Sequence, residues 1–331
     1  MATLVQLLVF ACLLLAVSCS VCYDDLGCFD TSMACHWRNP SSPADIGTTF
    51  KLYTRQNRYS GDVLDRTDDA TITSSNFESS LDTKLIVHGW TDSMTGDSWI
   101  DMRDALLDNY DINVVMVDWS DGAKMFYTKS RANTRVVGRE IAKLIEALNA
   151  ATGATFGSMH IIGHSLGRSH RWLRRRGMHG HHWPSIRPGL DPAGPEFAGD
   201  LDKSCRLDNT DANFVDVMHT DGEILILGGL GLMDELGHQD FYPNNGQEMP
   251  GCEGISPTCD HLKAVEYFIE SISSTCSFTA TKKGSTWDDL DDGLWTSCTS
   301  STCPQMGYKA DLSKGQGAFY LETNADSPYC Q

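Results

Sequence analysis

Basic residues are scarce in this chain. Its 26 lysines and arginines stand against 44 aspartates and glutamates, which gives a formal net charge of −18. A surface this acidic repels the phosphates of nucleic acids and the headgroups of strongly anionic membranes, so we exclude both as partners. Any contact with lipid is therefore expected to be apolar. The chain also lacks an Asn-x-Ser/Thr signal, and N-glycosylation is not predicted.

Long apolar runs are also scarce. The longest covers residues 3–17, which is shorter than the roughly 20 residues of a transmembrane helix, and small residues follow at Ser18 and Ser20. This pattern is typical of a secretory signal peptide. We therefore expect residues 1–20 to be removed and residues 21–331 to form an extracellular protein without a transmembrane anchor.

No internal repeat divides the chain, and no glycine-rich dinucleotide-binding fingerprint occurs in a strand-helix-strand context. With 331 residues, 41% of them hydrophobic, the chain is long enough for one large domain with a buried core. Residues beyond Ser273 are polar and cysteine-rich, and we expect loops there. We predict a single α/β domain.

Short β-rich runs alternate with amphipathic stretches, as in a parallel sheet covered by helices. Strands are predicted over residues 50–53, 84–90, 113–119 and 214–221, with another that ends at the glycine-rich turn of residues 163–167. A helix is predicted over residues 133–152 and a loop over residues 37–45. Parallel pairing places a ligand site beyond the carboxyl ends of the strands.

Residues 163–167 read GHSLG, which matches the pattern Gly-x-Ser-x-Gly. A serine hydroxyl becomes a useful nucleophile when a sharp strand-to-helix turn holds it out, and flanking glycines allow that turn to form. Ser165 is the candidate nucleophile. The alternative is a glycine-rich turn that carries a serine without chemistry.

A serine nucleophile needs a base and an orienting carboxylate. The chain order Ser165, Asp191, His261 is the order found in α/β hydrolases. We prefer His261 among eleven histidines because it follows Cys259 and opens a predicted helix, residues 261–272, capped by Asp260. Other histidines lie beside turn glycines or in polar turns and are candidates for structural roles: His88, His164, His219 and His238.

An oxyanion hole needs two backbone N–H groups, and the residue after the nucleophile supplies one of them. Leu166 and Trp90 are the candidates. Residues 224–233 read ILILGGLGLM, which is apolar and glycine-rich at once. Two interpretations stay open, a buried hairpin or a mobile apolar loop near the site.

Several longer motifs resemble the pancreatic lipase family over almost the whole mature chain. They read CYDDLGCF, HGW, VDW, GHSLG, GLDPAGP, FVDVMHTDG, GHQDFYPNNGQEMPGC, CDHLKAVEYFIESI and CPQMG. The resemblance implies an α/β-hydrolase fold with a mostly parallel central sheet and helices on both faces. It also implies that Ser165, Asp191 and His261 form the triad of a lipase and that Trp90 and Leu166 donate to the oxyanion.

The family also carries a calcium ion far from the chemistry, and RLDNTD, residues 206–211, matches that loop. The resemblance implies carboxylate ligands from Asp208 and Asp211 and carbonyl ligands from Lys203 and Arg206. Calcium prefers such oxygen ligands. The alternative is a solvated acidic turn. No organic cofactor is expected.

Two departures from the family pattern affect the expected function. The C-terminal sandwich domain that docks a helper protein is absent, so no colipase-type partner is expected. The lid is reduced to CEGISPTC, with six residues between Cys252 and Cys259, which is too short to shutter an apolar groove. A short lid resembles the phospholipase A1 branch. We therefore expect cleavage of phospholipid or galactolipid esters, with triacylglycerol hydrolysis or a catalytically silent lipid-binding relative as alternatives.

A third departure covers residues 168–188, which hold six arginines and four histidines where the family has small residues. One interpretation is a real basic loop. The other is a shifted reading frame, since one-base shifts at permitted codons turn residues 167–174 into GAHTAGYA and give TIGRVSG before GLDPAGP. Resequencing the transcript separates the two.

Ten cysteines remain after the signal peptide, as expected for a disulfide-bonded extracellular chain. Expected pairs are Cys22 with Cys28, Cys252 with Cys259, and Cys298 with Cys303. The other four, Cys35, Cys205, Cys276 and Cys330, allow three connectivities if they pair among themselves.

Overall fold

A computed structural model describes most of the chain beyond residue 19. The described residues are 20–31, 37–168, 185–198, 205–222, 229–254, 256–273, 277–282 and 303–331. Residues 1–19 of the predicted signal peptide lie outside them, as does most of the basic segment of residues 168–188. No helix among the described residues is long and apolar enough to cross a membrane.

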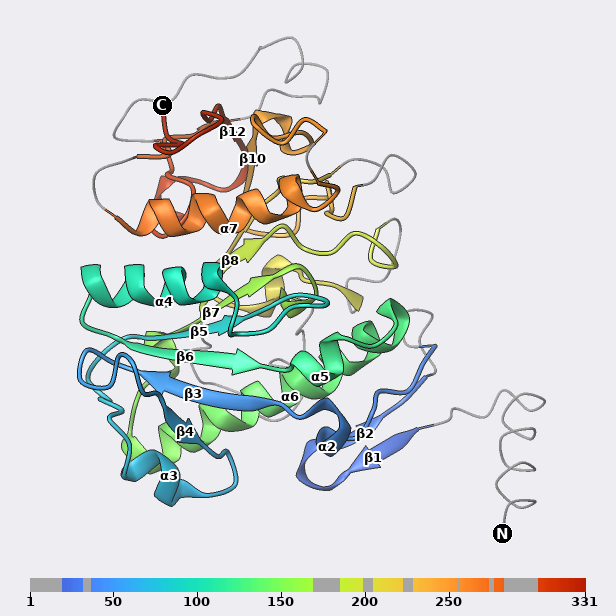
Figure 1. The fold of residues 1–331 in the computed structure, drawn as a ribbon, viewed down its shortest axis with the longest axis vertical. Coiled ribbons are helices and arrows are strands. Elements are labelled where there is room, and N and C mark those ends of the chain that lie inside the picture. Colours follow the sequence, from blue (N-terminus) through green and yellow to red (C-terminus); the bar gives the residue numbers. More distant parts are fainter. Residues whose placement is uncertain are drawn as a thin grey trace, which may run out of the picture.

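Ten strands of the described chain form one sheet in the order β11-β12-β10-β9-β8-β7-β5-β6-β3-β4 (Figure 1). The strands are β3 Thr49–Tyr53, β4 Asp62–Leu64, β5 Thr83–Val87, β6 Asn113–Asp118, β7 Met159–His164, β8 Ser185–Leu190, β9 Val215–Met218, β10 Gln239–Pro243, β11 Thr281–Lys282 and β12 Gly317–Leu321. From β6 to β12 neighbouring strands pair in parallel, and β3, β4 and β11 add antiparallel edges. This is the α/β-hydrolase fold.

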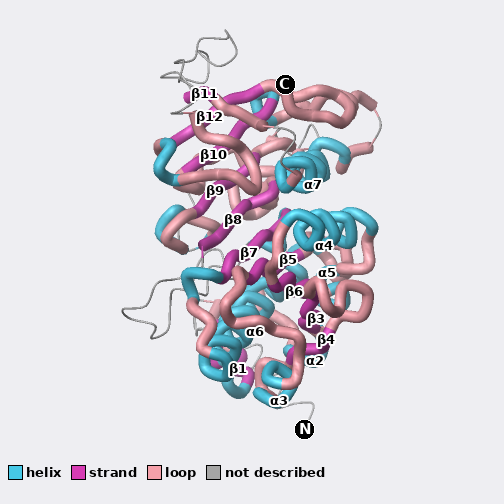
Figure 2. The backbone as a smooth tube through the Cα atoms, turned by 90° about the vertical axis from the view of Figure 1, so that its left-hand side faces the viewer, coloured by secondary structure: helices cyan, strands magenta, loops and turns pink. Residues whose placement is uncertain are grey.

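Helices cover both faces of the sheet and create two cores. The helices are α2 Pro43–Ile46, α3 Asp69–Thr73, α4 Asp97–Asn109, α5 Ser120–Ala123, α6 Tyr127–Thr152 and α7 Cys259–Ile272. Apolar residues of α6 pack with Leu85 and Val87 on one face, whereas Ile86 packs with α4 and α7 on the other. Both views show α4 and α7 side by side (Figures 1 and 2). The near-continuous apolar run of β5 therefore reflects burial on both faces.

A separate hairpin of β1 Val21–Tyr23 and β2 Gly27–Phe29 opens the described part of the chain. The predicted disulfide between Cys22 and Cys28 joins its two strands and is confirmed. The hairpin lies against α6, because Arg139 donates hydrogen bonds to the carbonyls of Leu26 and Cys28. Leu26 and Phe29 of this hairpin are buried in the same core as α6, and the disulfide closes the short loop between the strands.

Three predictions of local structure are wrong. The expected loop of residues 37–45 contains the start of α2, which Ser42 caps with Pro43 in the first position. The expected loops beyond Ser273 include β12, which pairs with β10 inside the sheet. Helix α7 begins at Cys259, so Asp260 lies within it and is not its cap. Its carboxylate accepts a hydrogen bond from the backbone N–H of Met249 instead.

Strand β8 carries the last residues of the basic segment, and its pairing there is irregular. Ile161 pairs with Ile186, but Gly163 pairs with Gly189, so β8 has one residue more than β7 over this stretch. Pro188 lies in the irregular part, and proline is rare inside a central strand because it lacks an N–H group. A shifted reading frame across residues 168–188 stays a hypothesis.

Candidate active site

Ser165 follows the last residue of β7 and opens a short 3-10 turn, Ser165–Arg168. Its φ of 54° lies in the left-handed region, which is unfavourable for a residue with a side chain. The side chain is 7% exposed. This strained strand-to-turn geometry holds the Ser165 hydroxyl away from the strand, as the Gly-x-Ser-x-Gly pattern predicts.

Two glycines, Gly89 and Gly167, allow the segment that follows β5 to pack against this turn. A Cβ atom on Gly167 would lie 2.5 Å from the carbonyl oxygen of His88, and one on Gly89 would lie 2.9 Å from Cβ of Ser165. Any side chain at either position would push the two segments apart. The glycines thus place the residue after Gly89, Trp90, beside the serine.

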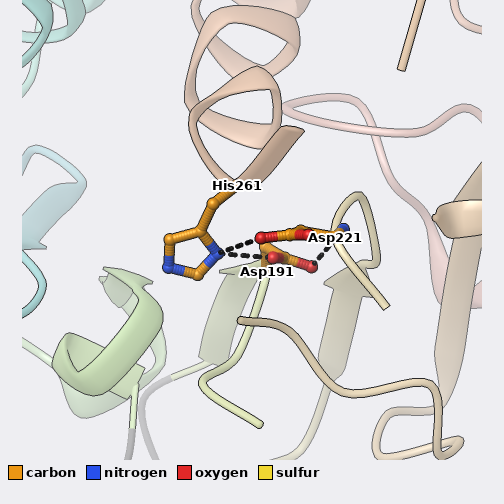
Figure 3. A group of neighbouring side chains, drawn as sticks. All are labelled: Asp191, Asp221 and His261. Carbon is orange, nitrogen blue, oxygen red and sulfur yellow. Dashed lines mark hydrogen bonds and ion pairs between the residues drawn. The ribbon is translucent and has the colours of Figure 1, made fainter. Parts of the chain in front are cut away.

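His261 and Asp191 meet at the carboxyl ends of the strands, as predicted from the chain order. Nδ1 of His261 lies 2.6 Å from Oδ2 of Asp191 (Figure 3). The other carboxylate oxygen, Oδ1, accepts hydrogen bonds from the backbone N–H groups of Thr220 and Asp221. Asp191 is fully buried and His261 is 6% exposed. The carboxylate is thereby fixed in place and orients the imidazole through one ring nitrogen.

Asp221 is a second carboxylate beside His261 that the sequence analysis did not single out. Its Oδ2 lies 4.0 Å from Nδ1 of His261 and accepts a hydrogen bond from the N–H of Leu230 (Figure 3). Burial, followed by the charge of Asp191, raises the pKa of Asp221 to about 7. A buried carboxylate beside a second carboxylate is disfavoured as an anion, which explains the raised pKa of Asp221.

The glycine-rich segment lies against this pair, and the part that the structure describes begins at Gly229. A Cβ atom on Gly231 would lie 2.5 Å from the carboxylate oxygens of Asp191, and its N–H donates to the carbonyl of Asp221. Gly231 therefore lets the segment cover the carboxylates. The described part of the segment therefore lies at the site. Residues 223–228 lie outside the described chain, so both interpretations, a buried hairpin and a mobile loop, stay predictions.

The other candidate histidines have partners away from Asp191. His88 lies 2.9 Å from the Gly89 carbonyl and accepts from the N–H of Trp119. His219 lies 2.9 Å from Asp240, and His238 accepts from the N–H of Val215. His164 lies against His261 itself, at 4.5 Å between ring centroids. Within the described chain, His261 is the histidine that carries a triad-like contact to a carboxylate and lines the same cavity as Ser165.

A cavity of about 590 Å³ opens above Ser165 and His261. Its walls are mostly apolar and aromatic. They come from the loop after β5, the starts of α4, α6 and α7, the segment after β8 and the glycine-rich segment; among the lining residues are Trp90, Trp99, Tyr127, Ala193, Pro195, Leu230, Leu262 and Val265. A cavity of this size accommodates an acyl chain.

The backbone N–H of Trp90 has no hydrogen-bond acceptor within the part of the chain that the structure describes. The indole Nε1 donates to the carbonyl of Met125, 2.9 Å away, and the ring meets Tyr127 edge-on. These contacts hold Trp90 at the cavity wall. Leu166 follows Ser165 directly and is fully buried.

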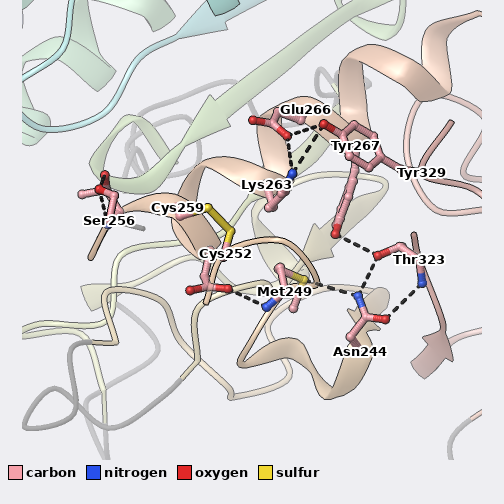
Figure 4. Close-up of a disulfide and its surroundings, with 12 residues drawn as sticks. Asn244, Met249, Cys252, Ser256, Cys259, Lys263, Glu266, Tyr267, Thr323 and Tyr329 are labelled. Carbon is pink, nitrogen blue, oxygen red and sulfur yellow. Dashed lines mark hydrogen bonds and ion pairs between the residues drawn. A yellow bond between two sulfur atoms is a disulfide. The ribbon is translucent and has the colours of Figure 1, made fainter. Parts of the chain in front are cut away.

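Helix α7, which carries His261, is anchored at its first residue. Cys259 forms the predicted disulfide with Cys252 across six intervening residues, and this prediction is confirmed (Figure 4). The side chain of Asp260 accepts from Met249 beside it. Cys303 is also in a disulfide, as are Cys205 and Cys330. The disulfide and the Met249 contact fix the start of the helix and therefore the position of the imidazole.

The segment that resembles a calcium loop forms a tight turn. Asp208 accepts from Thr210, Asp211 accepts from the N–H of Asp208, and both carboxylates are buried. The Arg206 side chain pairs with Asp234, and Lys203 lies outside the described residues. Buried carboxylates are typically paired with other groups or coordinate a metal ion. Their oxygen donors fit a hard cation such as calcium.

Comparison with known proteins identifies the family. A model of the family described as Lipase matches residues 19–329. Pancreatic lipase-related protein 2 of Cavia porcellus is 38% identical over 93% of this chain and 73% of its own length. Pancreatic triacylglycerol lipase of Myocastor coypus is 37% identical over the same shares, and inactive pancreatic lipase-related protein 1 of Homo sapiens is 35% identical over 94% and 72%. These matches support a carboxylic ester hydrolase, and the chain belongs to the lipase family.

Proposed function

We propose that this chain is a secreted lipase that cleaves acyl esters of glycerolipids by a Ser-His-Asp mechanism. The observation that carries the proposal is the contact between His261 and Asp191 at the wall of the cavity that Ser165 also lines. The strained backbone of Ser165 and the fixed carboxylate of Asp191 give each residue a chemical role. The extracellular location rests on the sequence of residues 1–20 and on the disulfides.

In the proposed reaction, Oγ of Ser165 attacks the ester carbonyl while Nε2 of His261 takes the hydroxyl proton. Asp191 stabilises the imidazolium through Nδ1–H, and the backbone N–H groups of Trp90 and Leu166 donate to the oxyanion. Collapse of the tetrahedral intermediate releases the alcohol, which receives the proton from His261. Water then attacks the acyl-serine by the same steps and releases the fatty acid.

We propose phospholipids or galactolipids as substrates, with triacylglycerol as the alternative. Only six residues separate Cys252 from Cys259, and the cavity wall next to this loop is formed by Thr258 and Leu262. A loop of that length leaves the cavity mouth open to a bulky polar headgroup. No colipase-type partner is required by this proposal.

An apolar rim supports contact with a lipid surface. We define the rim as Trp90, Phe126 and Leu262, whose exposed fractions are 39%, 88% and 39%. Trp90 and Leu262 line the cavity, and Phe126 lies between Met125, which accepts from Trp90, and Tyr127 on the cavity wall. Exposed aromatic groups beside an apolar cavity suit an uncharged or zwitterionic lipid surface, because the net charge of −18 opposes an anionic one.

We further propose that the turn of Asp208 and Asp211 binds a structural calcium ion, with backbone carbonyls of Lys203 and Arg206 as further ligands. The burial of both carboxylates supports this. Calcium would neutralise the turn and add stability, without a part in ester cleavage.

The rival is a catalytically silent lipid-binding relative. One relative at 35% identity is named an inactive lipase-related protein, so the fold alone does not establish turnover. The two proposals differ at Ser165, because a binding protein needs no nucleophile.

Hydrolysis assays with the purified chain test the proposal. Parent and Ser165→Ala protein are compared on phosphatidylcholine, galactolipid and trioleoylglycerol, with released fatty acid measured. We expect turnover that the alanine variant loses by at least about a thousandfold, with phospholipid or galactolipid preferred. Equal rates in the two proteins would overturn the enzyme proposal, and a preference for trioleoylglycerol would overturn the substrate proposal.

A further inference from the structure

His164 is a buried imidazole with no step in the proposed reaction. It is the last residue of β7, directly before Ser165, and is 4% exposed. Its Nε2 lies 3.1 Å from the backbone carbonyl oxygen of His261, which is 97 residues away in the sequence. A carbonyl can only accept, so Nε2 carries the hydrogen and donates it.

We infer that His164 is a positioning residue that holds the backbone of His261 at a fixed place relative to Ser165. The inference rests on the proposed function, since it assigns His164 a part in aligning the base with the nucleophile. The bond to Asp191 fixes only Nδ1 of the His261 ring. The bond from His164 fixes the main chain of His261, so this residue is held both at its ring and at its backbone.

The contact links the two reacting groups almost directly. His164 and Ser165 are neighbours in the chain, so a hydrogen bond from one of them to His261 transmits the position of β7 to the start of α7. The rings of His164 and His261 also lie against each other, with 4.5 Å between centroids and 47° between planes. A shift of about 1 Å between nucleophile and base is enough to slow such reactions by roughly a hundredfold.

The other side of the His164 ring faces the proposed oxyanion loop. A Cβ atom on Gly89 would lie 3.1 Å from Nδ1 of His164, so the ring fills the space between α7 and the residue before Trp90. No donor in the described chain reaches this Nδ1. Burial, followed by the charge of His261, lowers the pKa of His164 well below its usual range. A neutral ring adds no repulsion when His261 becomes an imidazolium.

Two amide substitutions separate a specific hydrogen bond from general polarity. The side chain of His164→Gln brings an N–H group to about the position of Nε2, whereas the shorter His164→Asn places it near Nδ1 and out of reach of His261. Hydrolysis of soluble 4-nitrophenyl butyrate gives kcat and KM without a lipid surface, and Tm is measured for every protein. His164→Leu, which has no donor, serves as a third variant.

We expect kcat of His164→Asn and His164→Leu to fall by about 10- to 100-fold, with KM changed less than about twofold. His164→Gln is expected to restore most of the lost kcat. Equal losses in Gln and Asn variants of similar Tm, or an unchanged kcat in the leucine variant, would overturn the inference. Absence of Ser165-dependent hydrolysis in the parent would instead overturn the proposed function.

Discussion

Asp191 and His261 lie 70 residues apart in the chain, yet Oδ2 of one is 2.6 Å from Nδ1 of the other. The contact forms because Asp191 follows the carboxyl end of β8, and α7 begins at the same end of the strands. The backbone N–H groups of Thr220 and Asp221 donate to the other oxygen, Oδ1, and fix the carboxylate so that Oδ2 faces the imidazole.

Replacing this carboxylate is expected to reduce turnover strongly. Asp191→Asn removes the charge that stabilises the imidazolium and favours the wrong tautomer, and we expect kcat to fall by about 10³- to 10⁴-fold. Kinetics on a soluble ester give the value. The matched control is Asp221→Asn, whose carboxylate is 4.0 Å from Nδ1, and we expect a loss below about tenfold. A larger loss in Asp221→Asn than in Asp191→Asn would mean that Asp221, and not Asp191, is the carboxylate that orients His261.

The raised pKa of Asp221 predicts how stability depends on pH. Burial and the charge of Asp191 raise this pKa from 3.8 to about 7 in the folded protein. Between these values the folded chain binds the proton and the unfolded chain does not, so the carboxyl group destabilises the fold increasingly as pH rises, up to about pH 7. The difference in Tm between Asp221→Asn and parent should therefore be near zero at about pH 4 and positive at about pH 8. A difference independent of pH would refute the prediction.

The apolar rim predicts selective effects on lipid surfaces. Phe126→Ser, made with Ser165→Ala to prevent hydrolysis, should weaken binding to phosphatidylcholine vesicles by about tenfold, because a phenylalanine side chain is lost from the contact. Co-sedimentation measures the binding. Tyr59→Ser is the matched control, because Tyr59 is 87% exposed, as Phe126 is 88%, but neither Tyr59 nor its chain neighbours line the cavity. Equal weakening in both variants would mean that Phe126 has no special role.

Calcium is expected to stabilise the fold without being needed for chemistry. Millimolar calcium should raise Tm of the chelator-treated parent, because an ion that binds only the folded state stabilises it. Asp208→Asn and Asp211→Asn should lose most of this shift. Asp234→Asn, which removes the ion pair of Arg206 but no proposed ligand, should keep it. The same shift in all four proteins would contradict the assignment.

The sequence predicted the parts of the fold that local pattern determines. Strands β5 and β6 are apolar on both faces, and the glycines around Ser165 are required by contacts as close as 2.5 Å, so both features leave a strong signal. The pairing of Asp191 with His261 was predicted from the chain order Ser165, Asp191, His261, which the family resemblance then supported.

The remaining features depend on contacts between distant segments. Aspartate is common as a helix cap, which is why the sequence predicted that role for Asp260. In the fold, Asp260 accepts a hydrogen bond from Met249 and Cys259 forms a disulfide, and the helix already begins at Cys259. Strand β12 is short and follows polar, cysteine-rich sequence, and it forms because β10 offers an edge. Asp221 became noticeable only when the fold placed it beside His261.

Covalent labelling tests the central claim most directly, because it requires a nucleophilic serine but no particular lipid. The parent is treated with a fluorophosphonate, and the modified residue is located by peptide mass spectrometry. We predict a single adduct on Ser165 in the parent, slower labelling in Asp191→Asn, and none in Ser165→Ala or after denaturation. An adduct on another residue, or no reaction of the folded parent, would contradict the account.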